Sequence, residues 1–490
     1  MKKNLALFFT KKTLKMFFLG FSSGLPILLV FSTLSVWLVK AGINRSTVTL
    51  FSWAGFAYAF KYLWSPIVDN YKIPYLKNFG HRKSWLILSQ SSIIFFLIFI
   101  AFLDPKNNLL LLALIVTLLA ISSATQDIVI DAFRIESAPQ IMQGPLSSMY
   151  IAGYRSAMIV SGAGSLWLAS YFGVETYNHA TWQKVYLIMA TLMFIGLSTS
   201  LLSIEPNIRR PKKLNSKNNL KFLFIILISI LVLIFLYSQL SSPFAKEDIV
   251  LNFLFATIRL ILCFGSAYLI IIFASKINFV SKKVFKSTYL NPILNFINKY
   301  GNFAFLILLL ISLYRIADVV MGVMANIFYI EKGYNVKDIA TYSKFFGVFA
   351  TIFGGFLGGF FSIKFGTMKT LFFGALIAAS SNLLFAWLAS VEISIKYLIY
   401  VITADNISSG FAGAAFVIYL SGLTSIKFTA TQYALFTSIM LFLPKLIAGY
   451  AGSWVDLVGY ESFFVITALL GVPVLFLIIW INKVIPIKIK

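Results

Sequence analysis

Long apolar runs that recur along the whole chain are the feature that most constrains its fold. Each run holds about 20 residues, which is the length that an α-helix needs to cross a hydrocarbon layer of about 30 Å. Of the 490 residues, 59% are hydrophobic and only 12% are charged, which leaves too little charge for the surface of a soluble protein. Continuous runs also exclude the alternating pattern of a transmembrane barrel. The sequence therefore predicts an all-α polytopic membrane protein.

The runs predict about fourteen transmembrane helices in three groups. Residues 1–204 hold six runs, residues 205–300 hold two runs between basic linkers, and residues 301–490 hold six more. Six plus six favours the major facilitator fold, in which two bundles face each other across a central cavity and open alternately. The spans are expected near 15–38, 46–68, 84–103, 109–131, 147–171, 182–204, 220–240, 248–274, 302–329, 338–362, 367–389, 395–420, 430–454 and 461–482.

The net charge of +25 has a topological explanation. Lys and Arg concentrate in the tails and in the loops on one side of the predicted spans, so the positive-inside rule places both termini in the cytoplasm and removes the need for a nucleic-acid partner. The first run is too long for a signal peptide and is read as a retained span. No cofactor is expected: the chain has one cysteine, its two histidines fall on opposite sides of the membrane, and no phosphate-binding loop is present. Because ATP is excluded as an energy source on this chain, a proton gradient, an ion gradient or the exchange of solutes would drive any transport.

Charged side chains interrupt the fourth run, between residues 121 and 139. Asp127 and Asp131 stand four apart and share one face of a helix, Arg134 lies one turn further on, and Gln126 is beside them. A charge in a membrane span costs about 3 kcal/mol even on lenient insertion scales, so these carboxylates need partners or an aqueous cavity. This is where the sequence first indicates function.

The two aspartates differ in depth. Asp131 lies near the inner interface, and we expect it to belong to an inner gate with Asp69 and Arg82, or to pair with Arg134. Asp127 is one turn deeper, where it can carry a proton or contact substrate. The gate is the structural reading of Asp131, with a substrate or proton role as its alternative, and for Asp127 a structural ion pair is the alternative.

Two cations of the first half lie deep in predicted spans. Lys61 lies well below the surface in span 2, so it either snorkels or faces the cavity. Tyr154 and Arg155 lie in span 5, about eight residues from its inner end. Arg155 can anchor a substrate anion or pair with a carboxylate of span 4, with Asp127 as the expected partner.

The second half has its own charged constellation. Arg315 and Asp318 stand three apart near the middle of span 9, either as a structural pair or as a site where a substrate anion takes over the arginine and frees the carboxylate for protonation. The second reading makes Asp318 the preferred proton-coupling residue. Asp405 in span 12 also needs a partner, which Lys445 of span 13 could supply.

Several motifs spread over both halves resemble the AmpG-type muropeptide permeases of the major facilitator superfamily. The resemblance covers roughly residues 15–205 and 300–480, includes the two-helix insertion, and is specific for the family only when the motifs are taken together. The motifs are GFSSGLPILLVFSTLSVWL (20–38), FAYAFKYLWSPIVDNY (56–71), ATQDIVIDAFR (124–134), GYRSAM (153–158), VSG (160–162), LYRIAD (313–318), DNISSG (405–410) and FTATQYALFTSI (428–439).

The resemblance implies a monomeric, proton-driven importer in the bacterial inner membrane. Its substrate would be an anionic sugar-peptide from cell-wall turnover, carried from periplasm to cytoplasm. The expected substrate contacts are Gln126, Arg155, Arg315, Lys61 and Tyr154, the expected proton sites are Asp318, Asp127 and Asp405, and the expected inner gate is Asp69, Arg82 and Asp131. The chain has Arg315 where the family usually has Lys and Lys445 where it usually has Arg, which keeps the charge but changes the geometry of anion recognition.

Three other readings stay open. The pattern QDI-x-x-D is shared with acetyl-CoA transporters, which makes a carrier of that class the first alternative. A diverged paralogue that carries another anionic metabolite on the same framework is the second. A membrane-embedded transferase is the distant alternative, because the chain lacks a reactive histidine and long catalytic loops.

Overall fold

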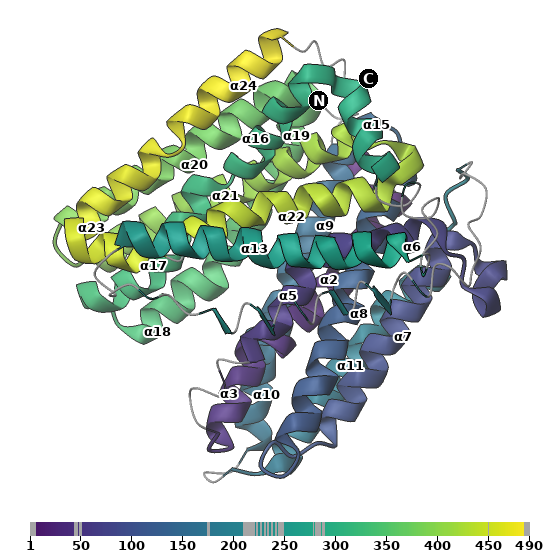
Figure 1. Cartoon of the computed structure of the whole chain (residues 1–490). Coiled ribbons are helices and arrows are strands. Elements are labelled where there is room, and N and C mark those ends of the chain that lie inside the picture. The colour runs from purple at the N-terminus through teal and green to yellow at the C-terminus, as the bar shows by residue number, and fades with distance from the viewer. Residues whose placement is uncertain are drawn as a thin grey trace.

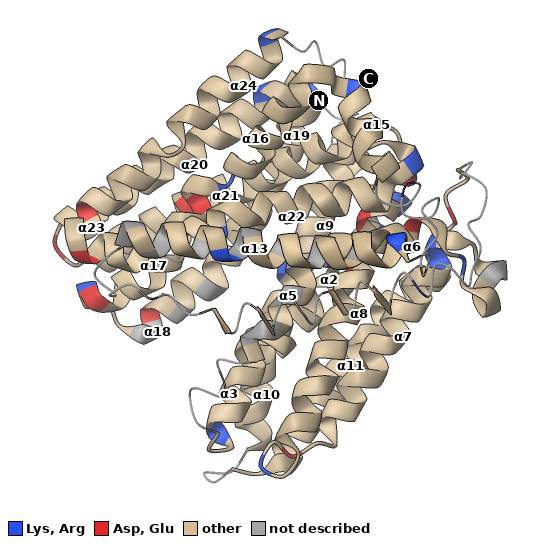
Figure 2. Ribbon diagram, in the orientation of Figure 1, with Lys and Arg blue, Asp and Glu red and all other residues tan. Residues whose placement is uncertain are grey.

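The computed structural model describes most of the chain. It covers residues 6–208 except 44–47, 49–50 and 174–176, isolated residues between 221 and 243, and residues 249–484 except 278, 280–285, 287–289 and 449. Within this part the chain is built of helices, as the apolar runs predict. Charged residues gather at the two ends of the molecule and are sparse along the helices (Figure 2). The protein is a multi-pass membrane protein.

The first half of the chain forms one bundle. Its helices begin and end abruptly at turns that carry glycine, proline or asparagine, and a π-helical turn at Val160–Gly164 joins two of them. The helices are α2 (Lys11–Val30), α3 (Ser32–Lys40), α5 (Phe56–Ala59), α6 (Ser65–Asn70), α7 (His81–Ala101), α8 (Leu109–Glu136), α9 (Gln143–Ile159), α10 (Ser165–Phe172) and α11 (His179–Leu201).

The last third of the chain forms a second bundle. Its largest apolar core is drawn almost wholly from residues 296–481, with Ile135 of the first bundle added at the edge. The helices are α15 (Asn291–Tyr300), α16 (Ala304–Leu313), α17 (Ile316–Lys332), α18 (Val336–Ile339), α19 (Gly347–Phe365), α20 (Thr367–Ser390), α21 (Ile395–Leu423), α22 (Thr429–Ala448), α23 (Ala451–Leu469) and α24 (Val472–Val484).

Ten helices in the described residues are long and apolar enough to cross a membrane. They correspond to ten of the fourteen predicted spans. Of the other four, span 147–171 is the helical stretch from α9 to α10, span 248–274 is α13 (Ile249–Lys276), and span 220–240 lies largely outside the described residues. Span 46–68 is wrong as one continuous helix, because short helical segments replace it around Gly55 and Pro66, the two residues least compatible with a helix interior.

Small residues allow the bundle helices to pack backbone to backbone. In the first bundle, a Cβ added to Gly20, Gly24 or Gly153 would collide with the backbone of the facing helix in the α2–α9 pair. In the second bundle, glycines hold α19 and α21 together in the same way. Close packing is therefore the role of these glycines, which agrees with the small-residue interfaces of membrane helices.

The two bundles meet at one end of the molecule and diverge at the other (Figure 1). We call the end that holds both chain termini the terminal end, and the opposite one the open end. At the terminal end α9 packs against α19 and α21, while α22 packs against α6 and α8. At the open end α3 and α10 of the first bundle point away from α17, α18 and α23 of the second. The arrangement is a V that is closed at the terminal end.

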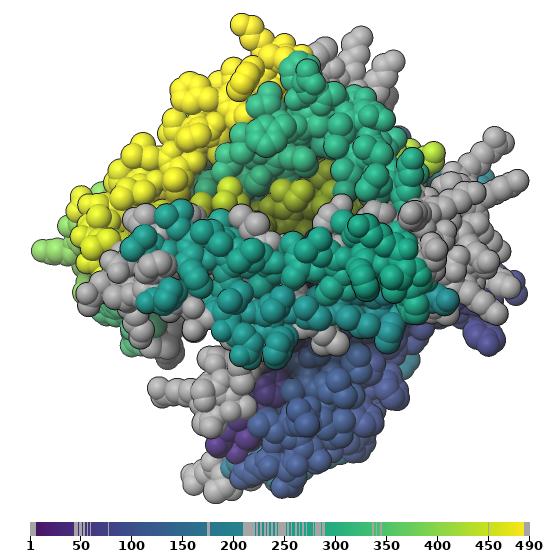
Figure 3. Space-filling model, in the orientation of Figure 1, coloured from purple at the N-terminus to yellow at the C-terminus, as the bar shows by residue number. Residues whose placement is uncertain are grey.

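Helix α13 belongs to the predicted two-helix insertion. On the face shown in Figure 3 its atoms lie along the boundary between the two bundles. Its single cysteine, Cys263, is buried in a small apolar cluster with Phe60 of the interrupted second span. This position indicates a packing role for the cysteine. The predicted domain limits at 204 and 300 stay predictions.

Candidate functional site

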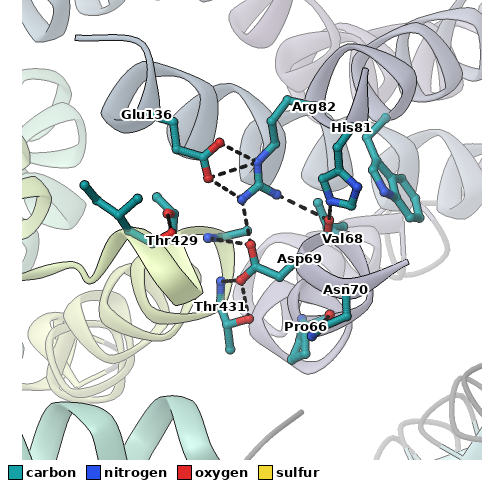
Figure 4. Close-up of polar contacts among 12 residues, drawn as sticks. Pro66, Val68, Asp69, Asn70, His81, Arg82, Glu136, Thr429 and Thr431 are labelled. Atoms are coloured by element: carbon teal, nitrogen blue, oxygen red, sulfur yellow. Dashed lines mark hydrogen bonds and ion pairs between the residues drawn. The ribbon is translucent and has the colours of Figure 1, made fainter. Parts of the chain in front are cut away.

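An ion-pair cluster closes the terminal end of the first bundle (Figure 4). Arg82, at the start of α7, is fully buried and its Nη2 lies 2.7 Å from Asp69 Oδ1 and 2.5 Å from Glu136 Oε1. The same guanidinium donates to the Val68 carbonyl at 3.3 Å. A buried arginine with two carboxylates and a carbonyl is well satisfied. The sequence predicted the proximity of Asp69 and Arg82, and the structure places them together.

Asp69 also joins the two bundles. Its carboxylate accepts bonds from the backbone N–H of Ala430 at 3.2 Å and of Thr431 at 2.8 Å, and from the Thr431 hydroxyl at 2.7 Å (Figure 4). These donors are the unpaired N–H groups of the first turn of α22, where a negative charge is favoured by the helix dipole. We call Asp69, Arg82, Glu136 and Thr431 the latch.

Two carboxylates that contact Arg82, one within the latch and one beside it, were not among the predicted residues. Glu136 ends α8 and binds Arg82, and Glu205 accepts from the backbone N–H groups of Arg82 and Lys83 at 2.9 and 3.0 Å. The available signal was that each acid ends an apolar run on the basic side of the membrane. That signal does not tell which helix N-terminus or arginine each one meets.

Asp131 lies one step away from the latch. It does not bind Arg82 but pairs with Arg134, with Oδ1 3.4 Å from Nη2. Arg134 is fully buried and also reaches the second bundle, donating to Ser421 of α21 at 2.9 Å. Of the predicted partners for Asp131, the structure therefore selects Arg134.

Asp127 lies in a hydroxyl cluster inside the first bundle. Its Oδ1 accepts from Ser23 at 2.5 Å, and the Ser23 hydroxyl lies 2.9 Å from that of Tyr150. Lys61 is close enough to both Asp127 and Asp131 to interact with them electrostatically. The expected pair of Asp127 with Arg155 is wrong, because the Ser23 hydroxyl of α2 bonds to the carboxylate instead.

Gln126 does not face the space between the bundles. Its side chain is fully buried, with Oε1 accepting from Ser22 at 3.1 Å, and Gln90 donates to the same serine at 3.3 Å. The expected substrate contact is therefore corrected to a packing contact in this state. Consecutive residues of a helix point about 100° apart, so Gln126 does not share the direction of its neighbour Asp127.

The constellation of the second half lies at a helix break. The helix stops at Leu313 and restarts at Ile316, so Arg315 has non-helical angles and Asp318 is in the first turn of α17. The Arg315 guanidinium forms an ion pair with Asp318, and both side chains are partly exposed. A break of this kind frees backbone groups and is a common way to build a site in mid-membrane.

Asp405 approaches this pair from α21. It accepts a bond from Ser381 at 3.3 Å and interacts electrostatically with both Asp318 and Arg315. The expected partnership of Asp405 with Lys445 is wrong, because Lys445 is exposed on α22 and Ser381 holds the carboxylate. Asn406, next in the chain, accepts from Thr351 of α19 at 2.9 Å.

Arg155 and Arg315 face each other from opposite bundles. Arg155 interacts electrostatically with Arg315 and Asp318, and Tyr154 lies beside it. Its only polar contact in the described residues is a weak one from Nη1 to the sulfur of Met158, and no carboxylate lies within ion-pair distance of it in that part of the chain. Arg315 is ion-paired with Asp318, whereas Arg155 has no ion-paired carboxylate in the described residues, so at this seam between the two bundles Arg155 is the cation left for an anion.

No group of three or more histidine, cysteine or acidic side chains in the described residues could hold a metal ion. What the arrangement can do chemically is bind an anion between the bundles and exchange protons at Asp318, Asp405 or Asp127. The latch lies at one end of the same seam. Binding and closure are thus built from separate residue sets.

Comparison with known proteins connects this geometry to transporters. The sequence model of the family described as Acetyl-coenzyme A transporter 1 matches residues 14–196. A Rickettsia conorii protein that bears the name AmpG 4 is 31% identical over 96% of both chains. The anhydromuropeptide permease of Escherichia coli K12 is 27% identical over 94% of this chain and 78% of its own.

Solved structures with the same fold are major facilitator superfamily transporters. FucP in its outward conformation has a TM-score of 0.62 at 11% identity, covering 97% of this chain and 99% of its own. The proton:xylose symporter XylE has a TM-score of 0.57 at 12% identity, covering 97% of this chain and 94% of its own. At such identities the likeness concerns the fold, which is that of the major facilitator superfamily.

Proposed function

The chain belongs to the AmpG family of transporters, and on that premise we propose that it imports anhydromuropeptides by proton symport. The substrate is a sugar-peptide with carboxylates on its peptide part. The membrane is the bacterial inner membrane, the terminal end faces the cytoplasm, and the transporter works as a monomer. In this assignment the V described above is open to the periplasm.

The facing arginines carry this proposal. Arg155 and Arg315 come from different bundles and interact with each other, and among the described residues Asp318 is ion-paired with Arg315 but not with Arg155. Like charges that face each other repel unless an anion lies between them, so a substrate carboxylate gains two charge-assisted contacts and draws the bundles together. Tyr154, beside Arg155, adds a phenol that can bond to sugar hydroxyls. Lys61 supplies a third cation nearer the terminal end.

Proton coupling is assigned to Asp318. Arg315 holds the Asp318 carboxylate in an ion pair. A substrate carboxylate that takes over Arg315 leaves Asp318 without its cation and free to accept a proton. Asp405 stands behind the pair and interacts electrostatically with both of its members. Asp127, bonded to Ser23, is the second candidate for the proton.

The experiment is uptake of labelled anhydromuropeptide by proteoliposomes that contain the purified protein. An inward proton gradient should accelerate uptake, and Arg155→Gln should lower it at least tenfold at low substrate concentration. Lys445→Gln is the matched control, because Lys445 is also a cation in a spanning helix but lies exposed on α22 and outside the site. Uptake that ignores the gradient, or equal loss in both variants, contradicts the assignment.

A second candidate rests on the family model. The match to the acetyl-coenzyme A transporter description covers the residues that contain Lys61, Asp127 and Arg155. Coenzyme A carries phosphates, which suit paired arginines as well as carboxylates do. Competition decides between them: acetyl-coenzyme A at millimolar concentration should leave muropeptide uptake unchanged under the first proposal and suppress it under the second.

A further inference from the structure

Arg134 is a buried cation at the seam that the latch does not use. Its Nη1 donates to Gln143 at 3.2 Å and to Ser147 at 3.1 Å in its own bundle, and to Ser421 of the other bundle at 2.9 Å. The guanidinium carbon lies 5.4 Å from the ring centre of Tyr433, also in the other bundle. Two of its contacts therefore exist only while the terminal end is closed.

The counter-charge of Arg134 is held loosely. Asp131 lies 3.4 Å away, whereas charge-assisted bonds are usually about 2.7–2.9 Å. Asp131 also feels the attraction of Lys61, which comes from the interrupted second span. The other titratable groups that face it are Asp127 of its own helix, Tyr150 of α9 and Tyr433 of α22. Asp131 is thus shared between one cation towards the middle of the membrane and one at the seam.

We propose that Lys61, Asp131 and Arg134 form a charge relay that couples anion binding to the opening of the terminal end. A substrate anion that binds Lys61 weakens the pull of Lys61 on Asp131. Asp131 then turns fully towards Arg134 and draws the guanidinium back into its own bundle. The bond to Ser421 and the contact with Tyr433 weaken, and the closed state loses stability. The relay rests on the proposed function only in taking the substrate to be an anion.

The equilibrium between the closed and the open terminal end can be measured without any substrate. Ile141 and Lys369 line one cavity of about 420 Å³ at the terminal end, Ile141 from the first bundle and Lys369 from the second. Both are exposed, so cysteines there accept spin labels in a Cys263→Ser background. In full-length protein reconstituted in lipid nanodiscs, a short distance between the labels reports a closed terminal end, and a long distance reports a terminal end that has opened.

Three variants have distinct expected results in the absence of substrate. Arg134→Gln removes a charged bond across the seam and should raise the long-distance population roughly 10- to 100-fold. Ser421→Ala removes only its acceptor and should give a smaller rise in the same direction. Lys61→Gln releases Asp131 as the substrate does and should raise the open population roughly fivefold. Lys445→Gln, the matched control, should leave the distances as in the wild type.

The outcomes separate the relay from the transport proposal. If Lys61 only binds substrate, Lys61→Gln weakens uptake but leaves the substrate-free distances unchanged, and the relay is overturned while the function stands. Unchanged distances in Ser421→Ala together with Arg134→Gln would likewise remove Arg134 from the closure. If Arg134→Gln does not fold, Ser421→Ala and Lys61→Gln carry the test. A shift in both with no muropeptide uptake leaves the relay intact and rejects the substrate.

Discussion

Replacing Asp69 with asparagine is the sharpest test of how the terminal end is held closed. The carboxylate accepts three bonds from the start of α22, two from backbone N–H groups and one from the Thr431 hydroxyl. Asparagine keeps the shape but has one acceptor oxygen and presents an NH₂ group where a second acceptor is needed. Its loss of charge also removes the favourable interaction with the N-terminus of a 20-residue helix.

The magnitude follows from which contacts cross the seam. The ion pair of Asp69 with Arg82 lies within the first bundle and persists in both states, so it does not shift the equilibrium. The bonds to α22 exist only in the closed state. Losing charge-assisted bonds of this kind costs about 1.5–3 kcal/mol, which corresponds to a roughly 10- to 100-fold larger population with an open terminal end.

The assay measures how often the seam opens. Ser148, buried between α9 and α19 with its hydroxyl bonded to the Gly355 carbonyl at 2.8 Å, is replaced by cysteine in a Cys263→Ser background. Its maleimide labelling rate is proportional to the open population when opening is fast. Asp69→Asn should raise that rate by the factor above.

Glu205→Gln is the matched control. Glu205 also caps a helix N-terminus, that of α7, through the N–H groups of Arg82 and Lys83, but both lie in the first bundle. Its labelling rate should stay within about twofold of the wild type. Equal rates for wild type and Asp69→Asn, or an equal rise in both variants, refute the reasoning, since capping would then act through folding rather than through the seam.

Further predictions concern the site and the packing. Arg155→Lys keeps the charge but loses the planar fork, so uptake should show a several-fold higher KM with little change in kcat. Asp318→Asn should remove the dependence of uptake on the proton gradient while substrate binding to the purified protein stays within a few-fold of the wild type. Gly153→Val places a side chain against the backbone of α2 and should cost about 1–3 kcal/mol or more, read as a lower temperature of thermal unfolding. Gly452→Val, with open space around it, should not lower that temperature.

The sequence is informative about the fold because apolar length is a direct physical requirement of the bilayer. Spanning helices such as α7 and α21 need about 20 apolar residues with a turn at each end, and the sequence shows both the apolar run and the turn residues. The second span was wrongly predicted as one continuous helix, because an apolar run does not reveal whether tertiary contacts keep the chain helical at Gly55 and Pro66. Its interruption matters, since Lys61 projects from that segment.

The site was predictable in its charges and not in its partners. A buried charge in a membrane span indicates function whatever its neighbours, so Arg155, Arg315 and Asp318 could be named from sequence. Partners depend on helix rotation and on which helices adjoin, and for this reason the pairs Asp127 with Arg155 and Asp405 with Lys445 were wrong. In both cases a nearby hydroxyl satisfies the carboxylate, and serines in spanning helices are too common to single out.

The few bonds across the seam set an energy that substrate binding can match. Asp69 with Thr431, Arg134 with Ser421, and Ser148 with Gly355 join the bundles at the terminal end. At about 1–3 kcal/mol each, these contacts hold the closed state by several kcal/mol. Moving a two-state equilibrium between closed and open terminal ends from 1:99 to 99:1 takes about 5.5 kcal/mol. Binding of a substrate anion by two arginines, with displacement of Asp318 from Arg315, can supply this energy. A closure made of many more bonds would be too stable to open, and one made of fewer would leak.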